Sequence, residues 1–169
     1  MPDNKDIRIG LIVMSDRASA GVRPDGVEGV IREFLSKEGV DLAEVSIIPD
    51  EADIIGKKLV EWADSGRFDL ILTSGGTGVS PRDVTPEATC AILQQQIPGI
   101  PEAMRAESLK ITNRAVLSRG VAGIRNGVMI VNLPGSPKAA LENLACVYSA
   151  LLHGVAKAQG DKSDCAPTS

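Results

Sequence analysis

Aromatic residues and histidine are scarce in this sequence, and each shortage weighs against a class of function. The 169 residues include one Trp, one Tyr and two Phe, so the core has to be built from Val, Ile, Leu and Ala. Base-stacking platforms for single-stranded nucleic acid need aromatic rings and are therefore disfavoured. The one histidine, His153, lies late in an apolar segment that is typical of a helix, which disfavours a Ser-His-Asp hydrolase.

Cysteine is also rare and shows no metal-binding pattern. Cys90, Cys146 and Cys165 are odd in number, widely spaced and without a Cys-x-x-Cys motif, which argues against a disulfide framework or a structural zinc site. A reducing cytoplasm is the simplest location for such a chain. We expect Cys90 and Cys146 to be buried on helices and Cys165 to lie in a loose tail.

Strong net charge and long apolar runs are missing as well. The 18 basic and 22 acidic residues give a net charge of −4, with no dense Lys/Arg run, so no nucleic-acid partner is expected. The apolar stretch over residues 7–14 is interrupted by Arg8 and Gly10, and it is too short to span a bilayer. We therefore expect no membrane partner.

The sequence does contain an alternation of strand-like and helix-like segments. Short runs rich in Val and Ile predict strands over residues 7–14, 45–48, 68–72, 121–124 and 128–131. Helical periodicity predicts helices between them, with N-caps at Asp50, Thr85 and Ser136, a break near residues 97–101 and a further helix over residues 102–117. The Asn126-Gly127 pair predicts an antiparallel hairpin between the last two strands.

This alternation predicts an α/β fold with three layers. A mostly parallel, twisted sheet carries helices on both faces and a small antiparallel hairpin. The composition, 43% hydrophobic and 24% charged, is that of a soluble globular protein. We expect residues 1–157 to form a single domain and the polar residues 158–169 to form a disordered tail.

Four loops with small or charged residues follow the carboxyl ends of the predicted strands. They span residues 15–21, 49–51, 73–83 and 133–137. In an open α/β sheet, ligands bind outside this edge. We therefore place the candidate site where these loops converge.

The loop that follows the third strand is the strongest of these signals. Gly75, Gly76 and Gly78 allow consecutive backbone N–H groups to surround one anion, beside the hydroxyls of Ser74 and Thr77. The loop is not a Walker A motif, because no Lys-Ser/Thr pair follows the glycines. The same glycines would also suit a connection that needs only positive φ angles.

Charged residues near this loop add to the phosphate-binding interpretation. Arg82 can neutralise phosphate oxygens, and Asp83 can hold Mg²⁺ directly or through water, although a solvent-exposed ion pair would look the same. Asp50 could share a metal ion with Asp83, but its spacing alone favours an ordinary N-cap.

Two further segments allow a functional and a structural interpretation. Ser15 and Asp16 could line the site or simply form a cap and a turn. Pro134, Gly135 and Ser136 place backbone amides at a helix start with Lys138 in reach, which suits an anion. A rigid turn into the last helix would explain the same residues.

At this level of detail the sequence resembles a known family. The run Leu72 to Gly78, a three-residue spacer, Arg82-Asp83 and then Thr85-Pro86-Glu87 are similar to the signature of the molybdenum-cofactor biosynthesis family, which includes MogA, MoaB and the amino-terminal domain of gephyrin. Residues 15–19, 48–51 and 132–135 also resemble MogA-type segments, in the same order. The resemblance covers the chain from Ile7 to about Val155.

The resemblance implies a molybdopterin adenylyltransferase, which transfers AMP from ATP to the terminal phosphate of molybdopterin with Mg²⁺ and releases pyrophosphate. It implies homotrimers and hand-over of the product to a molybdenum insertase. It also implies that Asp50 and Asp83 serve catalysis and hold Mg²⁺. Together with the four loops described above, it gives as nucleotide- and substrate-binding residues Ser15, Asp16, Ser74, Gly75, Gly76, Thr77, Gly78, Arg82, Pro134, Gly135, Ser136 and Lys138.

Two alternatives stay open. A protein of the same fold could bind molybdopterin as a scaffold without turning over ATP. The glycine-rich loop could also serve another nucleotide, as in the related domain of competence-damage proteins, although the segment 15–19 tells against it. The longer MogA forms carry an additional segment near the last helix that this chain lacks, which affects one wall of the pocket.

Overall fold

The computed structural model describes residues 7–22 and 26–161, and within them the strands form one six-stranded sheet. The strands are β1 (Ile9–Met14), β2 (Leu42–Ile48), β3 (Leu70–Ser74), β4 (Gln95–Gln96), β5 (Ala122–Arg125) and β6 (Val128–Leu133). Their order is β2-β1-β3-β6-β5-β4. β2, β1, β3 and β6 run parallel, and β5 and β4 are antiparallel additions at one edge.

The central strands are buried on both faces. Every residue of β1, β3 and β6 is buried, whereas the edge strand β2 is buried only at its two ends, Leu42 and Ile48. Continuous Val/Ile/Leu runs are typical of parallel strands that are covered by helices on both sides. The predicted α/β fold class is therefore confirmed.

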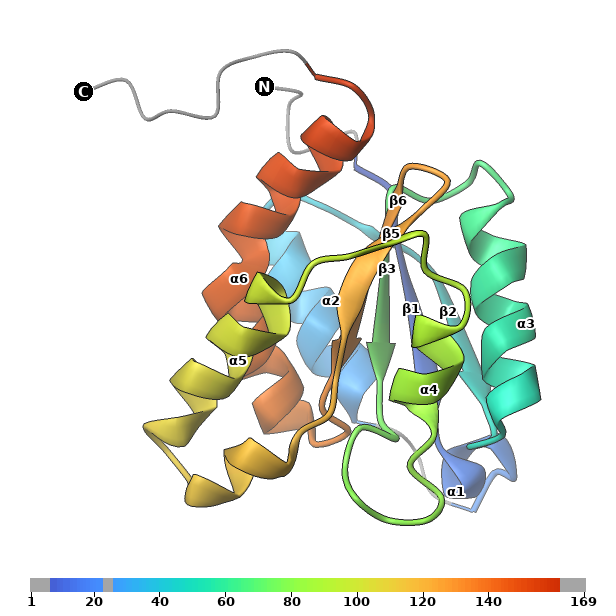
Figure 1. Cartoon of the computed structure of the whole chain (residues 1–169), viewed down its shortest axis with the longest axis vertical. Helices are drawn as coiled ribbons and strands as arrows, with labels where there is room; N and C mark the ends of the chain where they lie inside the picture. The colour runs from blue at the N-terminus through green and yellow to red at the C-terminus, as the bar shows by residue number, and fades with distance from the viewer. Residues whose placement is uncertain (1–6, 23–25, 162–169) are drawn as a thin grey trace.

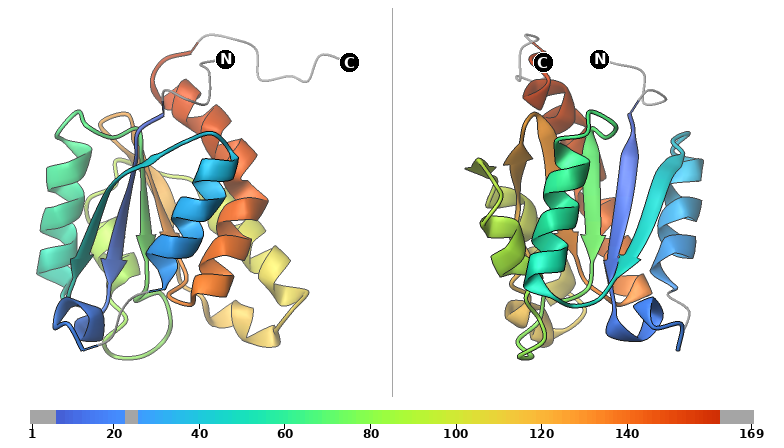
Figure 2. Two further views of the ribbon diagram at one scale, coloured as in Figure 1. Left: turned by 180° about the vertical axis from the view of Figure 1, so that it is seen from behind. Right: turned by 90° about the vertical axis from the view of Figure 1, so that its right-hand side faces the viewer.

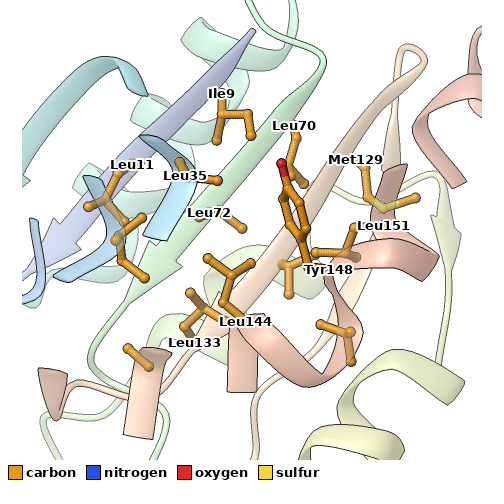
Figure 3. Packing of buried hydrophobic residues seen from close by; sticks show 14 of the residues in the cluster. Ile9, Leu11, Leu35, Leu70, Leu72, Met129, Leu133, Leu144, Tyr148 and Leu151 are labelled. Atoms are coloured by element: carbon orange, nitrogen blue, oxygen red, sulfur yellow. The ribbon is translucent and has the colours of Figure 1, made fainter. Parts of the chain in front are cut away.

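Helices cover both faces of the sheet, as Figures 1 and 2 show. One apolar cluster contains residues of α2 (Val27–Lys37), α5 (Gly99–Leu109) and α6 (Pro137–Ala158), and the other contains residues of α3 (Ala52–Ala63) and α4 (Thr85–Cys90). In Figure 3, Leu144, Tyr148 and Leu151 of α6 lie over Leu70 and Met129 of the sheet.

α6 is the one helix of the described residues that is long and apolar enough to cross a membrane. Nearly half of its apolar stretch is buried within the fold, with Leu144 and Leu151 fully inaccessible. Such burial is that of a core helix packed on a sheet.

The hairpin between β5 and β6 forms as predicted. Asn126 and Gly127 connect the two strands, with φ angles of 48° and 78°. Two consecutive positive φ angles match the right-handed twist of the flanking strands, and Asn-Gly is the pair that adopts them most readily.

The segment that follows the glycine-rich loop differs from the prediction. α4 ends at Cys90 rather than near residue 96, because the chain leaves the helix to form β4, which pairs with β5. Gln95 and Gln96 have no apolar alternation, so the sequence carries no sign of this edge strand. α5 then begins at Gly99 and ends at Leu109, and a 3₁₀ helix, η2 (Asn113–Leu117), follows instead of a continuous helix to residue 117.

The cysteines and the carboxyl-terminal tail also differ in part. Cys90 and Cys146 lie on helices, but Cys90 is only partly buried and Cys146 is exposed, so their predicted burial was wrong. Ala158, the first residue of the expected tail, is the last residue of α6. Cys165 and the rest of residues 162–169 lie outside the described residues.

Candidate functional site

The four loops predicted to converge do leave neighbouring strands at the carboxyl edge of the sheet. β2, β1, β3 and β6 are adjacent and parallel, and Figure 1 shows the short helix α1 (Asp16–Ser19) and the loop between β3 and α4 below this edge. Ser15 donates its amide to Ile48 (2.9 Å), and the Ser74 hydroxyl donates to the Pro134 carbonyl (2.9 Å). These bonds join the loop after β1 to the end of β2, and the loop after β3 to the turn after β6.

Asp16 and Asp50 form a reciprocal pair across two of these loops. The Asp16 amide donates to Asp50 Oδ2 (3.1 Å), and the Asp50 amide donates to Asp16 Oδ1 (3.0 Å). The expectation that Asp50 caps a helix was therefore wrong, since Glu51 occupies the N-cap position of α3 and its side chain makes no capping bond. The carboxylate of Asp50 is committed to the loop after β1 instead.

Burial raises the pKa of Asp50, and the carboxylates of Asp16 and Asp83 raise it further. The Asp16 hydrogen bond and the positive charge of Arg82 act in the opposite direction but do not outweigh these effects. The ionised form of Asp50 is thus disfavoured mainly by burial, and a cation bound beside the carboxylate would favour that form.

Arg82 lies at this edge but binds carboxylates. Its Nε and Nη2 donate to Asp16 Oδ2 (3.2 and 2.9 Å), and its Nη1 donates to Glu51 Oε1 (3.0 Å). The Asp16 pKa lies below its usual value because of the Asp50 amide and the Arg82 side chain. Arg82 thus fixes Asp16, and through it the loop that carries Asp50.

The glycine-rich loop contains two positions that only glycine fits. Gly75 and Gly76 have φ angles of 100° and 66°. A Cβ on Gly75 would lie 2.5 Å from the Met14 carbonyl oxygen, and one on Gly76 would lie 2.3 Å from Thr85 Oγ1. Positive φ and close approach of the backbone both require glycine here.

Thr85 holds this loop in place rather than capping α4. Its hydroxyl donates to the Gly75 carbonyl (2.9 Å) and its amide donates to the Gly76 carbonyl (3.2 Å). Val84 occupies the N-cap position. The predicted cap at Thr85 was wrong, because the side chain points into the loop that precedes the helix.

The two candidate catalytic carboxylates border the glycine-rich loop at different points. Asp50 Oδ1 lies 3.2 Å from the position of a Cβ on Gly76, and Asp83 Oδ2 lies 2.8 Å from that of a Cβ on Gly78. Asp83 Oδ2 also accepts the amide of Ser80 (2.9 Å). Within the described residues, Oδ1 of each carboxylate accepts no hydrogen bond.

The turn that follows β6 lies against the same loop. A Cβ on Gly135 would lie 3.2 Å from the Gly75 Cα. Ser136 caps α6 as predicted, since its hydroxyl accepts the Ala139 amide (3.5 Å). Lys138 is not brought to the loop: its side chain is 79% exposed, and its ammonium lies 3.9 Å from Glu142.

Two residues that sequence reasoning missed support this arrangement. Arg119, between η2 and β5, donates from its side chain to the carbonyls of Gly78 and Asp83 (2.7 Å each) and pairs with Glu87. Asn132 of β6 is buried and donates to the hydroxyls of Thr73 (2.9 Å) and Thr89 (3.1 Å). Arg119 stands outside every motif, and Asn132 begins the segment 132–135 but was given no role in the site.

A cavity of about 230 Å³ opens beside Pro134, between α5, η2 and the start of α6. Its lining is mainly apolar, with Arg105, Ser108 and Asn143 among the polar residues. Across the described residues, no cluster of three or more His, Cys, Asp or Glu side chains could enclose a metal ion. Any ion at this edge would have to take part of its ligands from a bound molecule or from water.

This chain is similar to known proteins over most of its length. A family model described as a probable molybdopterin binding domain matches residues 10–153. The molybdopterin adenylyltransferase of Helicobacter pylori (strain J99) is 46% identical over 147 residues, which cover 86% of this chain and 84% of that protein. The molybdopterin adenylyltransferase of Escherichia coli (strain K12) is 43% identical over 155 residues, covering 88% and 80%.

Solved structures give the same picture. The crystal structure of the molybdopterin biosynthesis enzyme MoaB from Thermus thermophilus superposes with a TM-score of 0.86 at 45% identity, covering 92% of this chain and 98% of that one. The Mog protein of Mycobacterium ulcerans gives 0.84 at 35% identity, with coverage of 92% and 98%.

Proposed function

Since this chain belongs to the family of probable molybdopterin-binding domains, we propose that it is a molybdopterin adenylyltransferase acting in molybdenum cofactor biosynthesis. Curated relatives that are 43–46% identical over most of its length carry that name. In this proposal, residues 1–157 act as one molybdopterin-binding domain, and ATP and molybdopterin are the substrates.

The observation that carries the proposal is the placement of two carboxylates on either side of one glycine-rich loop. Asp50 lies against Gly76 and Asp83 against Gly78. Across the described residues, the amides of Gly76, Thr77 and Gly78 donate to no protein acceptor. Free amides suit phosphate oxygens, and carboxylates suit the cation that accompanies a nucleotide.

The chemistry asks for positioning and charge neutralisation rather than covalent participation of the protein. An oxygen of the terminal phosphate of molybdopterin attacks the α-phosphorus of ATP. The new P–O bond forms as the bond to the β-phosphate oxygen breaks, and pyrophosphate leaves. The amides of residues 76–78 hold phosphate oxygens, and the amides of Gly135 and Ser136 in the neighbouring turn offer further donors.

We assign Asp50 and Asp83 as the residues that hold Mg²⁺. The two carboxylates suit Mg²⁺, because Oδ1 of each accepts no hydrogen bond from the described residues. Mg²⁺ favours oxygen ligands, of which one or two come from carboxylates and the others from phosphates and water. When bound, the ion would neutralise charge on the phosphate oxygens. Asp16 and Arg82 orient the loop that carries Asp50.

The remaining parts of the proposal rest on neighbouring features. The cavity beside Pro134 is next to the phosphate-binding turn and receives the pterin part of molybdopterin. The exposed side chains of α5, of η2 and of the turn between them include Leu109, Ile111, Val116 and Leu117, which suits a contact between copies in a homotrimer. The free thiols of Cys90 and Cys146 suit a reducing cytoplasm, where an insertase would receive the adenylated pterin.

A single-turnover assay tests the function. Purified protein is mixed with molybdopterin, Mg²⁺ and ATP labelled at the α-phosphate, beside Asp83→Asn. We expect label in the pterin with the parent protein and at least about a 100-fold slower transfer with the variant. Molybdopterin binding without any labelled product would instead identify a non-catalytic binding protein, and binding of nucleotide alone would identify a module for another nucleotide.

A further inference from the structure

Two residues hold the carbonyl groups of four consecutive residues in the glycine-rich loop. Thr85 binds the carbonyls of Gly75 and Gly76 through its hydroxyl and its amide. Arg119 binds the next two, since its amide donates to the Thr77 carbonyl (2.8 Å) and its Nε donates to the Gly78 carbonyl (2.7 Å).

Holding these carbonyls also sets the direction of the amides. In a trans peptide unit the C=O of one residue and the N–H of the next point in opposite directions. Carbonyls of residues 75–78 that face Thr85 and Arg119 therefore turn the N–H groups of residues 76–79 away from them. Across the described residues, none of these four N–H groups donates to a protein acceptor, so all four are available to an anion.

The same guanidinium reaches the second catalytic carboxylate through the backbone. Arg119 Nη2 donates to the Asp83 carbonyl (2.7 Å), and Nη1 pairs with Glu87 in the first turn of α4. The Arg119 side chain also holds the Glu87 pKa below its usual value. The Arg119 side chain thus holds both ends of the segment from residue 78 to residue 83. It also joins this segment to α4 through Glu87.

We infer that Arg119 is a positioning residue for adenylyl transfer, which keeps the amides of residues 76–79 and the Asp83 carboxylate in the geometry that phosphate binding requires. The inference rests on the proposed function for its kinetic consequence. Its structural consequence, the order of the loop in the ligand-free protein, does not depend on any activity. Arg119 lies outside the motif that runs from Leu72 to Glu87.

Arg125 provides a matched control. It is also an arginine with three side-chain hydrogen bonds, two to Asp64 (2.9 and 2.8 Å) and one to the Ile92 carbonyl (3.1 Å). It lies on β5 beside the hairpin and contacts no residue of the glycine-rich loop. Arg125→Ala should therefore remove the same number of side-chain hydrogen bonds as Arg119→Ala without moving the glycine-rich loop.

The experiment compares the parent protein with Arg119→Ala, Arg119→Lys and Arg125→Ala. Hydrogen–deuterium exchange of the ligand-free proteins reports on the order of the loop through the amides of residues 85 and 119, which donate to the Gly76 and Thr77 carbonyls, and steady-state assays give kcat and KM for ATP. A misplacement of about 1 Å can cost about 100-fold in rate. We therefore expect Arg119→Ala to exchange at least about 10-fold faster at these amides and to lose about 10- to 100-fold in kcat/KM, with free guanidinium ion restoring part of both.

Arg119→Lys separates charge from geometry, because an ammonium cannot reach the Gly78 carbonyl, the Asp83 carbonyl and Glu87 in one fork. We expect it to behave closer to Arg119→Ala than to the parent. Parental loop exchange in Arg119→Ala, or equal effects in Arg125→Ala, would overturn the inference. If the parent protein transfers no AMP, the proposed function fails, while the exchange measurement still decides the role of Arg119.

Discussion

Asp16 and Asp50 hold each other through reciprocal hydrogen bonds, in which the backbone amide of each donates to the carboxylate of the other (3.1 and 3.0 Å). The pair joins the loop after β1 to the loop after β2, although the two residues are 34 positions apart. Because Asp50 Oδ2 is used in this pair, Oδ1 is the oxygen that faces Gly76.

This relationship predicts that Asp16 acts by orienting Asp50. Asp16→Ala removes the acceptor for the Asp50 amide and the main partner of Arg82. The fold should persist, because the side chains of Asp16 and Arg82 are both exposed. We expect about a 10-fold loss in kcat/KM for ATP, since orientation errors act on the rate. Asp16→Asn keeps an acceptor oxygen and should retain more activity than Asp16→Ala. Equal activity of the two variants would contradict an orienting role.

A second prediction concerns the stability cost of Asp50. Burial and the neighbouring carboxylates raise the pKa of Asp50 in the folded protein, so the ionised form is disfavoured there relative to the unfolded chain. Asp50→Asn should therefore raise the unfolding temperature at neutral pH while abolishing adenylyl transfer, as is common for functional residues.

The sign of this effect sets its pH dependence. Below the unfolded-state pKa, Asp50 is protonated in both states and the advantage of Asn disappears. The advantage grows as the pH rises from there to the folded-state pKa, and above the folded-state pKa it is fully present. Thermal unfolding of both proteins from pH 4 to pH 8, in chelator and without nucleotide, measures the difference. A variant that is less stable than the parent at pH 8 would contradict the prediction.

The convergence of the four loops could be predicted from the sequence because it depends on local patterns. Val/Ile runs indicated the parallel strands, and the polar loops after them had to meet at one edge of the sheet. The hairpin depended on two adjacent residues, Asn126 and Gly127, whose positive φ angles are a property of those residue types.

The partners within the site could not be predicted, because they are distant in sequence. The local spacing of Asp50 is that of an N-cap, and only the position of the Asp16 amide shows otherwise. Arg119 binds carbonyls 36 and 41 positions away, and a single arginine between two short elements carries no pattern. β4 forms because β5 offers an unpaired edge, not because Gln95 and Gln96 favour strands.

Assembly provides a third prediction. Ile111, Val116 and Leu117 are 50–63% exposed on neighbouring segments, and apolar side chains gathered in this way favour burial against another surface. We expect the parent protein to sediment at three times its chain mass of 17.7 kDa and Leu117→Lys to sediment as a smaller species. Ile54→Glu, on the exposed side of α3, is the control and should leave the mass unchanged. A monomeric parent protein would contradict the assignment.

The last prediction compares two glycines that differ in backbone conformation and in surroundings. In Gly76→Ala the new methyl group would meet Thr85 Oγ1 at 2.3 Å, and the alanine would have to adopt a φ of 66°. Either the loop or Thr85 therefore has to move. We expect a loss of about 1–3 kcal/mol in the free energy of unfolding and at least about a 10-fold weaker binding of ATP, because displacement of Thr85 releases the Gly75 and Gly76 carbonyls. Gly29→Ala, in the exposed first turn of α2 with no atom within 4 Å of the new methyl group, should instead gain up to about 0.5 kcal/mol from helix propensity. Urea unfolding and calorimetric ATP titration of both variants measure the two effects. Parental ATP affinity in Gly76→Ala would show that the loop amides do not contribute to nucleotide binding.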